Sequence, residues 1–89
     1  LLARGQIATC RSLGGRGVDK FEGVLWHTSA HGTPVLDGAL ATIECTIHSV
    51  IEAGDHFIVL GRVLTMQAND ELSPLVFFRS AYAQVASAP

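Results

Sequence analysis

Four isolated side chains are the best candidates for chemistry in this sequence: Lys20, His56, Arg79 and Tyr82. Each lies in a predicted loop or near a strand end, where a polar group can reach a ligand while the backbone stays hydrogen-bonded. Cations and an imidazole at such places suit contacts to phosphate, carboxylate or amide oxygens. Each also has an ordinary structural interpretation, as a surface charge, a turn cap, an ion-pair partner or a rim aromatic.

The remaining chemistry-bearing residues do not assemble into a metal or nucleophile motif. His27 and His31 have i, i+4 spacing, but a Gly-Thr-Pro sequence follows and no Glu lies between them as in zinc proteases. Cys10 and Cys45 lie far apart with no partner at finger spacing, so we expect free thiols. The serines lack a nucleophile elbow, and the glycines at 14–17 lack the flanks of a phosphate loop. We therefore predict neither a metal site nor a catalytic side chain.

The first part of the chain predicts one short helix and then irregular structure. Residues 3–13 carry a modest amphipathic pattern. The glycines within 14–17 end this helix, because they permit left-handed backbone. Residues 18–36 contain turn residues and no sustained period, so we expect an ordered excursion that lies over a barrel.

The second part predicts three strands. Residues 39–50 alternate between Ile or Cys and polar residues, and residues 56–67 are rich in β-branched side chains. Gly61 inside the second strand indicates a bulge or a close backbone approach. A polar turn leads to a third strand at residues 75–85. Tight turns between the strands predict an antiparallel meander.

Size and composition indicate a single domain, residues 1–89, that lacks part of its fold. A chain of 89 residues buries only about 60–65% of its unfolded surface, yet 48% of these residues are hydrophobic. Three strands make a poor independent fold, and the opening Leu-Leu suggests a strand already under way. We therefore expect the apolar surface to meet missing strands or a partner.

Several protein classes are not expected. There is no signal-peptide pattern and no run of about 18 apolar residues. The net charge is −2 and the six basic residues are scattered, which gives nucleic acid no electrostatic footprint. We expect a cytoplasmic protein that binds neither nucleic acid nor membrane.

An ordered series of short motifs resembles the second half of the flavin reductase family, over roughly residues 3–83. The matching pieces are Asp19-Lys20-Phe21 with Gly23 and Trp26, Pro34-Val35-Leu36-Asp37-Gly38 with Leu40-Ala41, Gly54-Asp55-His56 with Gly61 and Val63, and Pro74-Leu75 with Phe77-Phe78-Arg79 and Tyr82. No single piece is decisive, whereas the series with matched spacing is specific.

This resemblance implies a fold and an activity. The fold is a mainly β, antiparallel split barrel of the FMN-binding type, incomplete here, with a short N-terminal helix; the chain is its C-terminal half. The activity is reduction of FMN or FAD by NADH or NADPH, and the reduced flavin then diffuses to a partner monooxygenase. The cofactors perform the hydride transfer, which fits a sequence without a visible catalytic group. The resemblance also implies a homodimer with the flavin near the subunit interface.

The resemblance assigns cofactor contacts to three stretches. The glycine-rich loop would close over the flavin, His56 would approach the nicotinamide, and the stretch around Arg79 would meet the pyridine nucleotide. The implied cofactor-binding residues are Arg16, Gly17, Asp19, Lys20, Phe21, His56, Phe77, Phe78, Arg79, Ser80 and Tyr82.

Two departures from the family pattern keep an alternative open. The family often has glycine where this chain has Ser80 and Ala83, and added side chains there would narrow a dinucleotide slot. A split-barrel protein that binds flavin or haem without turnover is the alternative function. A half-barrel whose only role is dimerisation is a third possibility.

Overall fold

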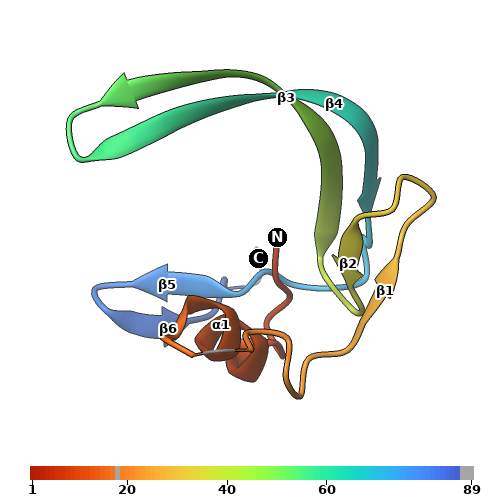
Figure 1. Cartoon of the computed structure of the whole chain (residues 1–89). Helices are drawn as coiled ribbons and strands as arrows, with labels where there is room; N and C mark the ends of the chain where they lie inside the picture. Colours follow the sequence, from red (N-terminus) through yellow and green to blue (C-terminus); the bar gives the residue numbers. More distant parts are fainter. Residues whose placement is uncertain (18, 87–89) are drawn as a thin grey trace.

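The computed structural model describes residues 1–17 and 19–86, and it is mainly β (Figure 1). One helix precedes six strands in the described residues. The elements are α1 (Ile7–Gly14), β1 (Trp26–Thr28), β2 (Pro34–Leu36), β3 (Ala41–Ala53), β4 (His56–Ala68), β5 (Val76–Phe78) and β6 (Ala81–Ala83).

Helix α1 confirms the predicted N-terminal helix with shifted ends. It starts at Ile7 rather than Ala3, because the chain turns first and the Gln6 side chain accepts a hydrogen bond from the Ala3 amide at 2.9 Å. It ends in the predicted glycine cluster, but Gly15 is extended (φ −77°, ψ 169°), so the expected left-handed end is wrong at this residue. A Cβ on Gly15 would lie 3.0 Å from the Arg11 carbonyl oxygen, so glycine provides space there.

Residues 26–36 form a hairpin, so the prediction of irregular structure there is wrong. Strands β1 and β2 pair antiparallel, with His27 opposite Val35 and Thr28 opposite Pro34. Three-residue strands are too short to show a period of two in the sequence. Pro34 is tolerated because it is the first residue of a strand.

Strands β3 and β4 form one hairpin of two 13-residue strands, as the sequence predicted. The pairing shifts between Glu44 and Cys45 and again between Ile47 and Ser49. Gly61 pairs with Ile47 at the second shift, and a Cβ on Gly61 would lie 2.9 Å from the Cys45 Cβ. Both predicted reasons for this glycine, a bulge and a close approach, are confirmed. The shift beside Ser49 interrupts the alternation expected along the strand.

The predicted third strand is a second short hairpin instead, so the expected meander is wrong. Residues 79–80 turn the chain between β5 and β6, and the described strands form three separate two-stranded sheets. The chain after β4 pairs with the N-terminal segment rather than with β4. The Arg4 amide donates to the Ser73 carbonyl at 2.8 Å, and the Leu75 amide donates to the Leu2 carbonyl at 3.0 Å.

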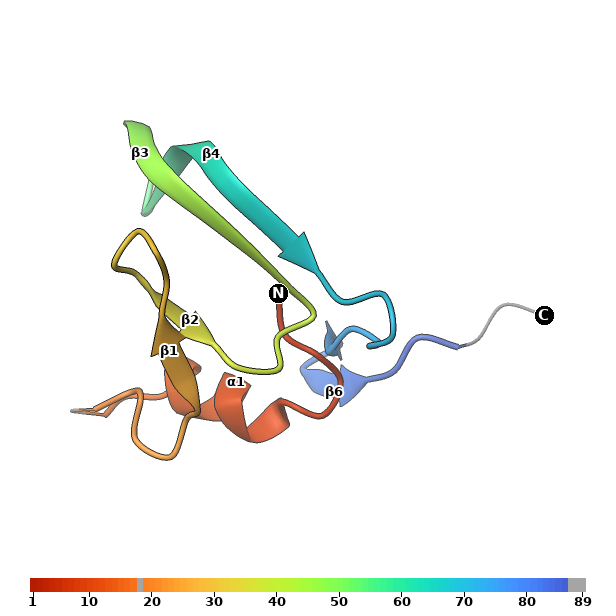
Figure 2. The same ribbon diagram turned by 90° about the vertical axis from the view of Figure 1, so that its right-hand side faces the viewer.

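The N-terminal segment joins the base of the long hairpin to the rest of the fold. The Leu40 amide donates to the Leu1 carbonyl at 3.0 Å, and Ala3 forms an isolated antiparallel bridge with Pro74. Figure 2 shows this segment between the hairpins and α1. Among the described residues, Ala3 is the one hydrophobic residue that is buried, with 6% of its surface exposed.

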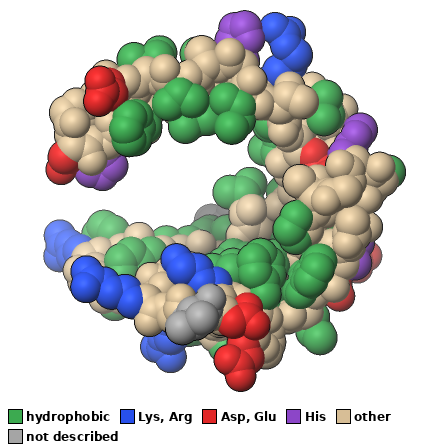
Figure 3. All heavy atoms as spheres, in the orientation of Figure 1, with side chains coloured by type: hydrophobic (Ala, Val, Ile, Leu, Met, Phe, Trp, Pro, Cys, Tyr) green, Lys and Arg blue, Asp and Glu red, His purple; other side chains and the backbone are tan. Residues whose placement is uncertain are grey.

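The molecule is an open curve rather than a closed body (Figure 1). Its radius of gyration is 14.9 Å, whereas a compact chain of this length has about 12 Å. Hydrophobic side chains line the hollow and also lie on the outer side of the long hairpin (Figure 3). The predicted thin core and excess apolar surface are both confirmed.

Candidate functional site

The structure distributes the predicted cofactor residues over three places. The glycine-rich stretch follows α1, the residues at 77–82 form the β5–β6 hairpin, and His56 begins β4 at the turn of the long hairpin. Contacts to α1 connect the first two places.

The glycine-rich stretch is held by local hydrogen bonds and one aromatic pair. The Ser12 hydroxyl donates to the Lys20 carbonyl oxygen at 3.2 Å, which ties the stretch back to α1. The Asp19 carboxylate accepts from the Phe21 amide at 3.0 Å. The rings of Phe21 and Trp26 meet edge to face with centroids 5.7 Å apart. Arg16, Gly17 and Lys20 are exposed, so their groups are available to a ligand.

The β5–β6 hairpin gathers three aromatic rings and two cations. Phe77 and Tyr82 meet edge to face at 5.4 Å, and the Arg79 guanidinium lies 5.1 Å from the centre of the Phe78 ring. The Arg11 guanidinium lies 5.2 Å from the centre of the Tyr82 ring, so α1 supports this hairpin. Phe77 and Phe78 remain 66% and 60% exposed. These open ring faces suit stacking with a planar ligand.

The environment of Tyr82 favours its protonated form. The hydrogen bond between its hydroxyl and the Cys10 thiol has the largest effect and raises the pKa of Tyr82 above its usual value, and partial desolvation raises it further. Arg11 acts in the opposite direction with a smaller effect. Tyr82 therefore presents a neutral hydroxyl near neutral pH.

The turn between β5 and β6 has a backbone conformation that favours glycine. Arg79 and Ser80 both have positive φ, 50° and 63°. Two successive left-handed residues form the hairpin turn that favours Asn-Gly, because a Cβ in this conformation is strained. This conformation is a reason for glycine at position 80 that does not depend on room for a dinucleotide.

His56 stands apart from the other predicted residues. Its Nδ1 lies 2.7 Å from the Asp55 carboxylate oxygen, and 81% of its side chain is exposed. The carboxylate keeps the proton on Nδ1, which leaves Nε2 for another group. The turn that holds His56 and the β5–β6 turn lie on the same open side of the molecule (Figure 1). Within the described residues, no recorded hydrogen bond joins His56 to the other predicted cofactor residues.

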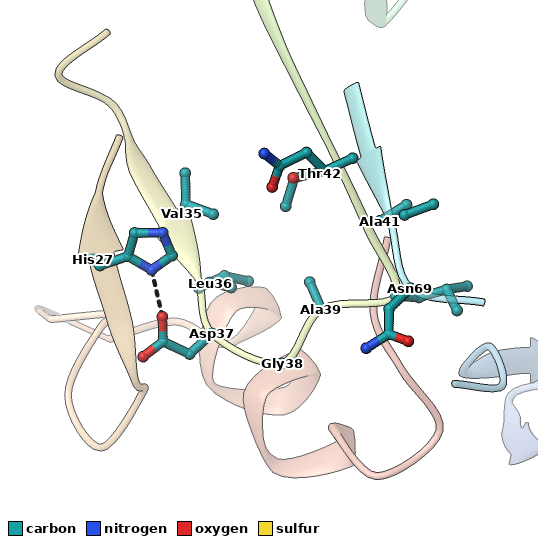
Figure 4. A pocket seen from close by; sticks show the side chains of 12 residues that line it. His27, Val35, Leu36, Asp37, Gly38, Ala39, Ala41, Thr42 and Asn69 are labelled. Carbon is teal, nitrogen blue, oxygen red and sulfur yellow. Dashed lines mark hydrogen bonds and ion pairs between the residues drawn. The ribbon is translucent and has the colours of Figure 1, made fainter. Parts of the chain in front are cut away.

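A histidine–aspartate pair beside a hollow of the fold was not predicted from the sequence. Figure 4 shows His27 turned toward Asp37, and its Nδ1 lies 2.5 Å from the carboxylate. The pair borders a cavity of about 270 Å³ between the β1–β2 hairpin and the base of β3–β4, which Thr42 and Asn69 also line. From the sequence, His27 was considered only for its i, i+4 spacing to His31. Its contact with Asp37 was missed because it follows from a hairpin that was not predicted.

A second missed feature is the Glu44 cluster, which consists of Glu44, Ser29, Thr33 and Thr65. One carboxylate oxygen of Glu44 accepts from the hydroxyls of Ser29 and Thr33, the latter at 2.5 Å. The other accepts from the Thr65 hydroxyl at 2.9 Å. These hydrogen bonds, in the order Ser29, Thr33 and Thr65, lower the pKa of Glu44 from 4.5 to about 2. Glu44 is therefore ionised at every physiological pH.

Comparison with known proteins decides the family. Residues 1–86 match the flavin reductase like domain. The chain belongs to this family. This flavin reductase like domain is 39% identical over 87 residues to a flavin reductase of Pseudomonas putida. The match covers 98% of the chain and 51% of that relative. The chain thus spans about half the length of the relatives it matches.

Solved structures agree with the observed fold. The domain superposes on nitrilotriacetate monooxygenase component B from Mycobacterium thermoresistibile with a TM-score of 0.90 and 37% identity, over 100% of this chain and 52% of the other. It also superposes on an NADH:FAD oxidoreductase of Streptomyces globisporus that was solved with NAD and FAD fragments. The TM-score is 0.91 and the identity 33%, over 97% of this chain and 53% of the other.

The predicted fold class is confirmed. The flavin reductase like domain is mainly β, has one short helix, and forms part of a split barrel that is not closed in these residues. No described helix is long and apolar enough to cross a membrane.

Proposed function

We propose that the protein is an NAD(P)H-dependent flavin reductase that supplies reduced FMN or FAD to a partner monooxygenase. The observation that carries this proposal is the family match over residues 1–86, together with superposition at a TM-score of 0.90 on a protein named as a monooxygenase component B. A relative named as an NADH:FAD oxidoreductase supports the same pair of cofactors.

The described residues fit planar cofactors. Exposed rings of Phe77 and Phe78 offer stacking surface, and Arg79 and Lys20 offer cations for phosphate or carboxamide oxygens. In this proposal Arg16, Gly17, Asp19, Lys20 and Phe21 contact the flavin. His56 and the residues of the β5–β6 hairpin contact the pyridine nucleotide: Phe77, Phe78, Arg79, Ser80 and Tyr82.

The chemistry requires positioning rather than acid–base catalysis. Bound flavin and nicotinamide would themselves supply the hydride-transfer chemistry, so the protein would need no proton-transfer group. The chain's own tasks are to hold the two ring systems in contact and to exclude water. The Nε2 of His56 is free to hydrogen-bond the nicotinamide amide, because Asp55 occupies Nδ1.

The proposal includes a homodimer and a domain of which residues 1–89 are the C-terminal half. Support comes from the long hairpin, whose outer half is apolar on both faces. Val50 pairs with Val59 and Ile51 pairs with Ile58, and successive pairs point to opposite faces. These four side chains are 48–55% exposed. One face suits the remaining barrel strands, and the other suits a second subunit.

The test is a turnover assay on the full-length protein. NADH or NADPH is mixed with FMN or FAD, and the nicotinamide absorbance is followed with oxygen present. We expect flavin-dependent oxidation with at least one donor and one flavin. A flavin-bound protein that dithionite reduces and NAD(P)H does not would identify the non-catalytic binding protein instead. Failure to bind either flavin would contradict both and leave the structural half-barrel.

A further inference from the structure

The Glu44 cluster is the polar connection between the two hairpins at the base of the fold. Ser29 and Thr33 flank the turn between β1 and β2, Glu44 lies on β3, and Thr65 lies opposite it on β4. In the described residues, the recorded hydrogen bonds from the β1–β2 hairpin to the β3–β4 hairpin all end on Glu44. Glu44 therefore holds one hairpin on the other.

The hydrogen bonds in this cluster favour an ionised carboxylate, because three hydroxyl groups donate to the oxygens of Glu44. The Ser29 hydroxyl accepts from the amides of His31 and Thr33 at 3.2 and 3.3 Å, so its own proton is free for Glu44. Thr33 and Thr65 supply the other two protons. A protonated Glu44 or a glutamine could keep a partner only by turning one hydroxyl round to accept, and it would lose the charge that strengthens all three hydrogen bonds. The cluster is thus an acceptor site that loss of charge at position 44 weakens.

A short chain of contacts leads from this cluster to the proposed flavin loop. Ser29 directly follows β1, which begins at Trp26. The Trp26 ring meets the Phe21 ring at 5.7 Å, and the Phe21 amide binds Asp19. On the other side, the loop is tied to α1 only through the Lys20 carbonyl among the recorded hydrogen bonds of the described residues. The Trp26 ring therefore couples the position of β1 to that of Phe21, whose carbonyl also accepts from the Val24 amide at 3.0 Å.

We propose that Glu44 is a positioning residue for flavin binding. By fixing the β1–β2 hairpin on β3–β4, it holds Trp26, and through Trp26 the Phe21 ring, in the place where the flavin is bound. This inference rests on the proposed function, because it assigns Phe21 to the flavin. Glu44 itself touches no cofactor in this scheme, so its loss acts on binding and leaves the hydride step at saturating flavin unchanged.

The experiment compares Glu44→Gln with Glu52→Gln in the full-length protein. Glu52 lies on the same strand and, within the described residues, has no recorded side-chain hydrogen bond. Fluorescence titration with FMN and FAD gives Kd, and steady-state assays give KM and kcat. For Glu44→Gln we expect Kd and KM for the flavin to rise about tenfold, with kcat and the KM for NADH within twofold of wild type. Glu52→Gln should match wild type in all four.

Two further variants keep the test decisive if Glu44→Gln does not fold. Thr65→Val removes one donor at nearly constant volume, and we expect about a threefold rise in flavin Kd. Ser29→Ala removes another donor. Because both act through Glu44, the combined effect of Ser29→Ala and Glu44→Gln should be smaller than the product of the single effects.

Hydrogen exchange at residues 29–33 separates the possible outcomes. Faster exchange in Glu44→Gln together with weaker flavin binding supports the proposal. Faster exchange with unchanged flavin Kd shows a purely structural cluster and overturns it, as does unchanged exchange. A wild-type protein that fails to bind flavin contradicts the proposed function itself, whereas an active wild type with a normal Glu44→Gln variant contradicts only the role of Glu44.

Discussion

The two ends of the long hairpin differ in the side chains that they present and in the partners that these side chains have within the chain. At the base, Glu44 accepts three hydroxyl hydrogen bonds, and β3 is tied to the N-terminal segment through Leu40. At the outer half, residues 49–60, hydrophobic side chains on both faces are about half exposed. At the base the carboxylate is paired within the described residues, although Ile43 and Met66 there remain 53% and 67% exposed. The apolar faces of the outer half require contacts from elsewhere.

This difference follows from the two kinds of interaction. The hydrogen bonds of Glu44 are complete once its three hydroxyl partners are in place, and all three lie in the described residues. Hydrophobic burial depends on the area covered, so the apolar faces gain it only where another element lies on them.

The largest expected effect follows from charging the outer half. In the full-length protein, Ile58→Asp and Val59→Asp place a carboxylate on opposite faces of β4. We expect each variant to lose at least about 3 kcal/mol of stability, in the subunit or in the dimer, because a buried unpaired charge is costly. Thermal unfolding and mass by light scattering measure this.

A solvent-exposed face would tolerate the change. If either variant keeps both the wild-type Tm and the wild-type mass, the face that it occupies is uncovered, and the outer half is not apolar on two covered sides. Thr46→Asp, at a polar position opposite Arg62 and nearer the base, serves as the control for added charge on the same hairpin.

The next effect concerns the tip of the outer half. We expect His56→Ala to raise the KM for NADH about tenfold while the flavin Kd stays within twofold, because one hydrogen bond to the nicotinamide is lost. Steady-state kinetics at saturating flavin measure it. An unchanged KM for NADH would remove His56 from the site. Substitution of His48, an exposed histidine of β3, is the matched control.

A smaller effect is expected at the turn facing that tip. Ser80→Gly should stabilise the full-length protein by about 1 kcal/mol, because Ser80 has φ of 63° and glycine adopts this conformation without strain. Chemical denaturation measures the gain. A destabilised variant would mean that the Ser80 side chain makes contacts which outweigh the strain.

The smallest effect is the pH dependence of the base. The pKa of Glu44 is lowered from 4.5 to about 2, so its cluster contributes stability above pH 4.5 and loses it as the pH falls toward 2. The difference in unfolding free energy between wild type and Glu44→Gln should be constant from pH 7 to about 5 and should then shrink as the pH falls further. Denaturation at a series of pH values measures it, and a difference that persists at pH 2.5 would contradict this assignment.

Long elements with strong periodicity were predictable from the sequence. The strands that became β3 and β4 were predicted at residues 39–50 and 56–67, the first from its alternation and the second from its β-branched residues, and Gly54 marks the turn between them with φ of 64°. The excess of apolar residues predicted an incomplete core. The ordered motifs predicted the family, because spacing along the chain is a property that the sequence carries directly.

Short elements and the partners of polar side chains were decided by the tertiary structure. Strands of three residues, such as β1 and β5, exist because another strand lies beside them. The contact of His27 with Asp37 and that of Glu44 with Thr65 follow from register, which no local pattern reveals. Amino-acid order fixed which segments are extended and which surface is apolar. Only the pairing of distant segments decided which hydroxyl meets which carboxylate, because a hydrogen bond depends on positions in space to within a fraction of an ångström.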